Sequence, residues 1–488
     1  MRLDKEKLEH SINICKQCIL SKKQIVLIKN SEYSTWPLFF LEGVQPREDG
    51  IDICATALGV IASSYFINEN TYNEIYNAVK EGISTLLFVR NVDGSWPSKI
   101  SLVAKDNVSM EGVISDTYYA LSALMTVGFI TKSPRIPNIS DPLTNRILNE
   151  TDRLAIVEKG VQWLLDNRVG QGWGYTGVKY LEDGMGRNVI PAYVVPSTNA
   201  ITVLSQILSV EKKVAPLSPL INMMETAIKE TVNWFCEIQN QDGGFGIKRG
   251  EKSRIGNTAK VLVALCTVSV PKDIEAKINS VINKAIKFIL KHYNPKKISF
   301  ESVSEDFSQF IVETNNGEVN AYKRPIIHEL YLEPLLLESL SLYYMRTFSV
   351  TVSNSSKKSA FFKSKICRVM KGVCEEMLLK QKEDGEIQGA VRSRRPARFE
   401  GYTMYACADL ICAFSALIDN NEIMKSVINA TLKQNLLIAV YILLVLLVFV
   451  PVIFSQNPIW LSVLLLILNP IALSIISTLI EKVLLNTE

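Results

Sequence analysis

Two aspartates stand at the starts of apolar stretches with the composition of helices. Asp52 opens the stretch 52–66 (DICATALGVIASSYF), and Asp116 is the second residue of 115–124 (SDTYYALSAL). An aspartate at a helix start accepts hydrogen bonds from the free backbone amides of the first turn. A carboxyl group held among apolar residues keeps its proton and can act as a general acid. We predict Asp52 and Asp116 as catalytic residues, with helix capping as the alternative interpretation of each.

Tyrosines recur on the same predicted apolar helices. Aromatic faces attract cations and offer broad apolar contact area, although at helical spacing they also pack as core. We predict that these side chains line a cavity and contact a substrate; they are Tyr118, Tyr119, Tyr331, Tyr402 and Tyr405.

A basic stretch precedes the last of these helices. Arg394, Arg395 and Arg398 are followed by Glu400. Guanidinium groups can hold a diphosphate through paired hydrogen bonds, and they can equally face anionic lipid. We predict these four residues as part of a substrate-binding site.

Metal ligands are sparse. The chain has 3 histidines, and Cys15-x-x-Cys18 has no second pair to complete a metal site. Asp52 and Cys54 with His328 make an incomplete zinc set. The flank 48–52 (EDGID) approaches a carboxylate motif that holds Mg²⁺ against a diphosphate. We predict no metal and no cofactor, with Mg²⁺ at this flank as the alternative.

A repeated unit positions these residues. A helix, a turn of glycine and aromatic residues, and a more apolar helix recur along the chain, which indicates a repeat architecture. We count six such helical hairpins and predict that four turn glycines occupy equivalent places at one rim. The clearest turns lie in 80–96, 159–175, 229–246 and 371–387, and the four glycines are Gly94, Gly172, Gly243 and Gly385.

The repeat resembles the QW repeat of terpenoid cyclases and protein prenyltransferase β subunits. The resemblance implies an all-α (α/α)6 toroid over residues 1–425, with an inner ring of helices around a cavity. Class II cyclases of that family carry Asp-x-Asp-Asp-Thr at the start of an inner helix. The matching stretch here is 113–117 (VISDT), in which Ser115 stands where the family has its proton donor. The resemblance thus favours the fold and leaves the activity open.

The C-terminal segment has a different composition. Residues 436–454 and 459–480 are free of charged side chains, and each stretch is long enough to span a bilayer. We predict a transmembrane helical hairpin over 436–485. Lys425, Lys433 and Lys482 flank the two spans, so the positive-inside rule predicts a cell-membrane protein with its toroid on the cytoplasmic side.

The overall charge excludes one class of partner. A net charge of +4, from 53 basic and 49 acidic residues, is too small to indicate nucleic-acid binding. We predict a membrane-anchored protein that acts on or binds an isoprenoid or another apolar molecule, with membrane lipids and a protein as partners. The alternatives are a non-catalytic toroid that binds a lipid or protein at the membrane, and a membrane effector with a sensing toroid.

Overall fold

In the described part of the chain, twelve α-helices alternate between an outer and an inner position. The computed structural model describes residues 3–28, 31–40, 50–67, 74–97, 99–101, 112–175, 191–216, 218–269, 272–294, 300–315, 318–348, 357–386, 388–392 and 402–430. The even-numbered helices are α2 (Ile53–Ser64), α4 (Ile114–Thr126), α6 (Val194–Val214), α8 (Ile255–Thr267), α10 (Leu332–Phe348) and α12 (Met404–Asp419). The odd-numbered helices are α1 (Lys5–Ser21), α3 (Glu74–Phe88), α5 (Glu150–Asp166), α7 (Leu220–Ile238), α9 (Lys272–His292) and α11 (Lys357–Leu379).

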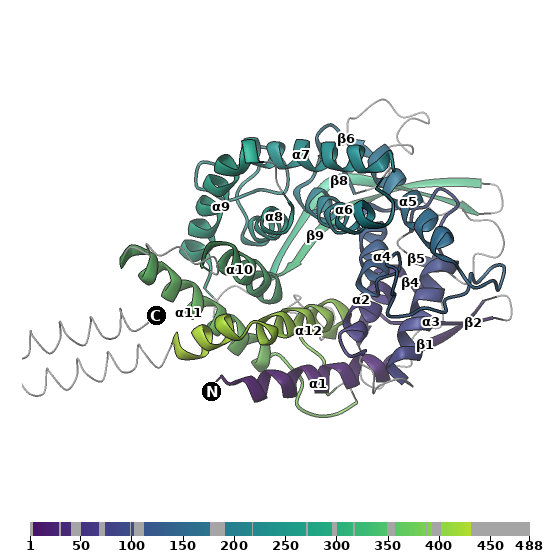
Figure 1. Ribbon diagram of the computed structural model, residues 1–488, viewed down its shortest axis with the longest axis horizontal. Coiled ribbons are helices and arrows are strands. Elements are labelled where there is room, and N and C mark those ends of the chain that lie inside the picture. The colour runs from purple at the N-terminus through teal and green to yellow at the C-terminus, as the bar shows by residue number, and fades with distance from the viewer. Residues whose placement is uncertain are drawn as a thin grey trace, which may run out of the picture.

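The even-numbered helices form a closed inner ring. Each packs on the next in order, and α12 packs on α2, which closes the circle (Figure 1). The odd-numbered helices lie outside this ring. They are amphipathic, as α7 and α9 show, whereas inner helices such as α2 and α8 are buried over most of their surface. The predicted (α/α)6 toroid of six hairpins is confirmed.

A buried tryptophan anchors the turn inside each well-kept hairpin. The indole Nε1 of Trp36, Trp96 and Trp173 donates to a backbone carbonyl near the end of the preceding outer helix, at Ile19, Leu86 and Leu164. The backbone amide of Trp96 donates over 3.0 Å to the hydroxyl of Thr117, the fourth residue of α4.

The same amide bond recurs around the ring. Trp173 donates to Ser197 over 2.9 Å, and Phe245 donates to Thr258 over 2.9 Å. In the last hairpin the amide of Val391 donates to the sulfur of Cys407. The acceptor is the fourth residue of the inner helix each time, so this bond fixes α4, α6, α8 and α12 to their own turns in one register.

A second repeated bond joins neighbouring hairpins. The first amide of an inner helix donates to the carbonyl two residues after the anchoring aromatic of the next hairpin: Ile114 to Tyr175, and Val194 to Ile247. The amide of Met404 makes this bond with Leu38 over 3.0 Å. The end of the chain therefore joins its beginning through the bond that links interior copies, because the toroid is a closed repeat.

The turn glycines correct part of the predicted alignment. Gly94 and Gly243 both have positive φ, 93° and 90°, and both lie two residues before the anchoring aromatic. A Cβ at either position would meet the backbone of the next outer helix, at Lys159 or Lys284. Gly172 instead directly precedes Trp173, so it is offset by one position from that place.

The last hairpin also differs from the prediction. Gly389, two residues before Val391, has φ 87° and lies against Ile14 of α1, which is the next outer helix around the ring. Gly389 is therefore the equivalent of Gly94, in place of the predicted Gly385. An extra turn at 383–386 lengthens the connection between α11 and α12. The spacing of residues in the sequence did not reveal that this turn moves the equivalent glycine from position 385 to position 389.

Short antiparallel strands close the inter-helix connections. β3 (Phe39–Phe40) pairs with β10 (Tyr402–Thr403), β4 (Gly50–Asp52) with β5 (Lys99–Ser101), and β6 (Arg168–Val169) with β7 (Gly172–Trp173). β1 (Gln24–Ile28) and β2 (Ser31–Thr35) form a further hairpin. The long hairpin of β8 (Phe300–Asn315) and β9 (Glu318–Tyr331) leads into α10 and extends across the ring in the view of Figure 1.

The prediction for His328 is corrected, and the predicted membrane spans find no support among the described residues. His328 belongs to β9 and does not head an inner helix, because α10 begins at Leu332. Within the described ranges, no helix combines the length and the apolar composition needed to cross a bilayer. The predicted spans 436–454 and 459–480 lie outside the described residues.

Candidate functional site

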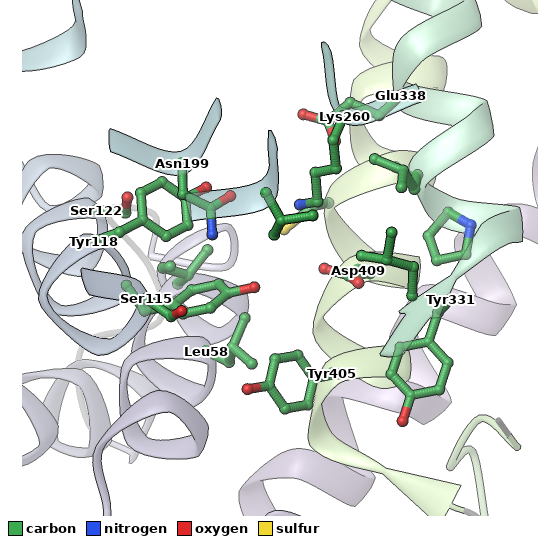
Figure 2. A pocket seen from close by; sticks show the side chains of 18 of the residues that line it. Leu58, Ser115, Tyr118, Ser122, Asn199, Lys260, Tyr331, Glu338, Tyr405 and Asp409 are labelled. Carbon is green, nitrogen blue, oxygen red and sulfur yellow. The ribbon is translucent and has the colours of Figure 1, made fainter. Parts of the chain in front are cut away.

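A cavity of about 520 Å³ runs along the axis of the toroid and is lined by all six inner helices (Figure 2). This volume is within the range of small-molecule sites. On α12 the lining extends from Tyr405 to Ala416, which at about 1.5 Å per residue corresponds to roughly 16 Å of depth. The cavity therefore has room for an extended ligand.

One set of equivalent positions contains the charged residues of the described lining. The sixth residue of α2, α4, α6, α8 and α12 lines the cavity, and α10 contributes its seventh residue. Because α4, α6, α8 and α12 are fixed to their turns in one register, equivalent positions on these helices come to the same level. These six residues are Leu58, Tyr119, Asn199, Lys260, Glu338 and Asp409.

Two carboxyl groups and one ammonium group lie close together at this level. Figure 2 shows Lys260, Glu338 and Asp409 on one side of the cavity. Burial raises the pKa of Asp409 to about 7 against the opposing effect of Lys260, and the neighbouring Glu338 contributes to this rise. Burial likewise raises the pKa of Glu338 against the effect of Lys260.

The environment of Glu338 explains this behaviour. Its side chain is accessible to water from inside the cavity but is enclosed by protein, so it is poorly solvated despite its exposure.

An acid with a pKa near 7 can both accept and donate a proton at neutral pH, which is the property required of a general acid–base catalyst. Asp409 has this property.

A chain of tyrosines forms another part of the wall. The ring centroids of Tyr118 and Tyr119 are 4.8 Å apart, those of Tyr119 and Tyr405 are 5.9 Å apart, and those of Tyr331 and Tyr405 are 6.3 Å apart. In Figure 2, Tyr118 and Asp409 lie on opposite sides of the cavity. Tyr331 lies on the same side as Asp409, and Tyr405 is on α12 itself, one turn before Asp409. This tyrosine wall therefore extends around the cavity, and a ligand in the centre would contact aromatic rings on both sides and the charged groups on one.

The predicted site residues are only partly brought together. Tyr118, Tyr119, Tyr331 and Tyr405 line the cavity, whereas Tyr402 lies in β10 and is absent from the lining. Lys382 lies over the ring of Tyr402, with its nitrogen 5.9 Å from the centroid. The predicted residues Arg394, Arg395, Arg398 and Glu400 lie outside the described residues.

Asp52 and Asp116 are near the cavity but do not line it. Asp52 is the N-cap of α2, and its carboxylate accepts from the amide of Ala55 over 2.8 Å. Asp116 is buried in the first turn of α4, where burial and the proximity of Asp52 raise its pKa. It is close enough to Tyr119 and Tyr405 to raise their pKa values as well. The capping alternative holds for Asp52, and the catalytic role of both residues stays a prediction.

Metal ligands are absent from the described ranges, in which no group of three or more His, Cys, Asp or Glu side chains could hold a metal ion. Cys15 and Cys18 are buried free thiols. Burial raises the pKa of both thiols, so neither is a ready nucleophile. Residues 41–49, which include Glu48 and Asp49 of the flank considered for Mg²⁺, lie outside the described residues.

Sequence reasoning missed Lys260, Glu338 and Asp409, although one pattern could have revealed them. Each interrupts an otherwise apolar stretch of an inner helix: TAKVLVAL, LLLESLSL and ACADLICAF. A charged side chain on a helix that is buried all round must face a cavity or a partner. Aligning the inner helices by their fourth residue places Lys260 and Asp409 at one level.

Comparisons with known proteins support the fold. No family model matches the chain, and no curated protein matches it. Among solved structures, the chain is similar to a cellobiose 2-epimerase from Spirochaeta thermophila DSM 6192, with a TM-score of 0.54, 10% identity, and coverage of 85% of this chain and 96% of that one.

Two further structures match over similar lengths. A D-mannose isomerase has a TM-score of 0.51 at 11% identity, covering 84% of this chain and 98% of that one. A cellobiose 2-epimerase from Bacillus thermoamylovorans B4167 has a TM-score of 0.50 at 10% identity, covering 83% and 99%. At these identities the similarity establishes a shared α/α toroid.

These findings correct the predicted function. The structures just described are sugar-processing enzymes by their titles, so the prediction of a terpenoid-like protein that acts on an isoprenoid is wrong, as is the prediction of membrane lipids and an isoprenoid as partners. The physical reason lies in the repeat, because the turn aromatics that carried the resemblance, such as Trp96 and Trp173, are buried and fix hairpins together. These aromatic residues therefore indicate how the helices pack and do not indicate which reaction the protein catalyses.

The predicted localisation in the cell membrane is contradicted as well. No described helix could cross a bilayer, and the structures to which the chain is similar are titled as enzymes of sugars. The alternatives that placed the toroid at a membrane are contradicted with it. Hydropathy measures how well a segment avoids water, and this alone does not distinguish a bilayer from a protein interior.

Proposed function

We propose that this protein binds a small carbohydrate in the toroid cavity and catalyses proton transfer on it, as in an isomerisation or epimerisation. The observation that carries the proposal is the level that contains Lys260, Glu338 and Asp409, in a cavity that tyrosines also line. The titles of the similar structures, two cellobiose 2-epimerases and a D-mannose isomerase, support the same class of chemistry.

The amphipathic lining suits a sugar. The faces of a pyranose ring present C–H groups that pack on aromatic rings such as those of Tyr119 and Tyr405, while hydroxyl groups at the ring edge donate to carboxylates. Asn199 and Ser115 add neutral hydrogen-bonding groups to the lining. A purely apolar ligand would leave the buried charges without partners, which is costly.

The chemistry follows from the positions of the charged groups. In an open-chain sugar, the ionised carboxylate of Asp409 removes the proton from the carbon next to the carbonyl, and the electron pair moves onto the carbonyl oxygen. The ammonium of Lys260 stabilises the negative charge that develops on that oxygen. An isomer forms when the proton returns to the former carbonyl carbon and the proton of the adjacent hydroxyl group moves to the first oxygen, which leaves a new carbonyl at the neighbouring carbon. An epimer forms when a proton is delivered to the opposite face of the original carbon and the carbonyl is restored.

Incubation with a panel of reducing sugars tests the proposal. We expect at least one mono- or disaccharide to be converted to an isomer of the same mass, as resolved by anion-exchange chromatography and NMR. Asp409→Asn removes the base while keeping the shape of the side chain, and general acid–base catalysis contributes about 10²- to 10⁴-fold to a rate. We therefore expect a loss of that size with sugar binding retained.

Two results would count against the proposal. If no sugar in the panel binds, the cavity serves another class of ligand. If a sugar is converted and Asp409→Asn keeps the full rate, another residue performs the proton transfer.

A further inference from the structure

The charges that line the cavity are unbalanced. Among its described lining residues, Glu338 and Asp409 are acidic, and Lys260 is the basic one. The net formal charge of the lining is therefore −1 when both acids are ionised. Lys260 acts on both carboxyl groups and opposes the rise in pKa of each, but both pKa values remain raised. One ammonium group thus does not compensate the two acids.

This imbalance extends beyond the lining. The two acids also act on each other and on neighbouring groups: Glu338 and Asp409 both raise the pKa of the phenol of Tyr118 and of the thiol of Cys412. Asp116 lies behind Tyr119 and adds a further acidic group near the tyrosine wall. The interior of the toroid consequently has an excess of acidic groups around its central level.

From this arrangement we infer that the preferred carbohydrate carries a positively charged amino group, which lies between Glu338 and the tyrosine wall. The inference rests on the proposed function and specifies its substrate class. The carboxylate of Glu338 is reachable from the cavity, so an ammonium group can form a charge-assisted hydrogen bond with it. The faces of Tyr119 and Tyr405 also favour a cation over a neutral group.

The same arrangement disfavours other sugars. A phosphorylated or acidic sugar would bring a further negative charge to a poorly solvated site that already contains two acidic groups. An N-acetylated sugar has the same ring but no charge, so it leaves the acidic excess in place. A neutral sugar hydroxyl can also bond to the carboxylate of Glu338, but it brings no positive charge to offset the acidic excess.

Isothermal titration calorimetry of the full chain at pH 7 tests the inference with glucosamine, N-acetylglucosamine, glucose and glucuronate. We expect glucosamine to bind about tenfold more tightly than glucose, the size of effect that one charged hydrogen bond supplies. Glu338→Gln should reduce this preference to less than about threefold, since the amide keeps the shape of the side chain and loses its charge. Glu383→Gln, at an exposed position on the turn after α11, is the matched control and should change neither affinity.

A second variant should change the affinity for glucosamine in the direction opposite to that of Glu338→Gln. Lys260→Met removes the competing ammonium, so glucosamine should bind more tightly while glucose does not. A structural defect would weaken both sugars together. This variant therefore separates an electrostatic effect from a loss of folding.

The outcomes distinguish the inference from the proposed function. If glucose or N-acetylglucosamine binds as tightly as glucosamine, the inference is overturned and the carbohydrate proposal stands. If glucuronate binds best, the cavity prefers a negatively charged sugar to a positively charged one, and the inference again fails. If none of the four sugars binds, the proposed function itself fails.

Discussion

The raised pKa of Asp409 makes a quantitative prediction about stability. In the folded protein its pKa is about 7, compared with 3.8 for an ordinary aspartate. The difference of about 3 units corresponds to roughly 4 kcal/mol, at about 1.4 kcal/mol per unit. This energy is the cost of keeping an ionised carboxylate in the cavity beside Glu338.

The sign follows from proton linkage. Below about pH 4 the carboxyl group is protonated in both folded and unfolded chains, so it carries no penalty. Between about pH 4 and pH 7 the unfolded chain loses this proton first, and the folded state is progressively destabilised. Above pH 7 the penalty is complete and constant. Asp409→Asn mimics the protonated form, so it should raise the free energy of unfolding at pH 8 by up to about 4 kcal/mol and leave it nearly unchanged at pH 4.

Urea unfolding followed by circular dichroism at pH 4, 6 and 8 measures the effect. The control is Asp384→Asn, at an exposed position of the turn after α11, which should show no pH-dependent difference from the wild type. A difference between Asp409→Asn and wild type that is the same at every pH would refute the electrostatic argument. A variant that is less stable than wild type at pH 8 would show that the ionised Asp409 stabilises the fold.

The repeated contacts of the fold make two further predictions, both measured as shifts in the midpoint of urea unfolding. Gly243→Ala should cost more than Gly250→Ala, because both have positive φ (90° and 81°) but only at Gly243 would the added Cβ meet a backbone carbonyl, that of Lys284 at 2.7 Å. Equal costs would mean that backbone strain, about 1–3 kcal/mol, accounts for both. Thr258→Val leaves the buried amide of Phe245 without its acceptor and should cost about 1–3 kcal/mol, with faster hydrogen exchange at that amide. Thr267→Val should cost less, because the hydroxyl of Thr267 bonds within its own helix. If the amide of Phe245 exchanges at the same rate in Thr258→Val as in the wild type, the proposed anchoring role of Thr258 is contradicted.

The sequence was sufficient to predict the fold because the repeat is encoded in local features. The turn glycines, such as Gly94 and Gly243, and the tryptophan that fills the turn can be recognised directly in the sequence, and they recur in the well-kept hairpins. The position of Gly389 was not visible in this way. Its equivalence to Gly94 depends on a contact with α1, which lies more than 370 residues away along the chain, and on an extra turn that shifts the spacing.

The site was harder to predict because its residues do not form a motif. Lys260, Glu338 and Asp409 lie on three helices and meet only when the helices are in register around the ring. The tyrosines were found since aromatic residues on inner helices indicate a cavity in any toroid. Tyr402 was included wrongly in that set, because the short strand β10 takes it out of α12 and away from the cavity lining.

Incorporation of solvent deuterium tests the central claim most directly. The protein is incubated in D₂O with a sugar that it converts, and the sugar is followed by NMR. If Asp409 removes the proton from the carbon next to the carbonyl, deuterium enters at the carbon that receives the returning proton, which is the same carbon in an epimer and its neighbour in an isomer. We expect this incorporation in the wild type and at a rate about 10²- to 10⁴-fold lower in Asp409→Asn. Conversion of the sugar without deuterium at the carbon that receives the proton, or equal incorporation by the two proteins, would contradict the account.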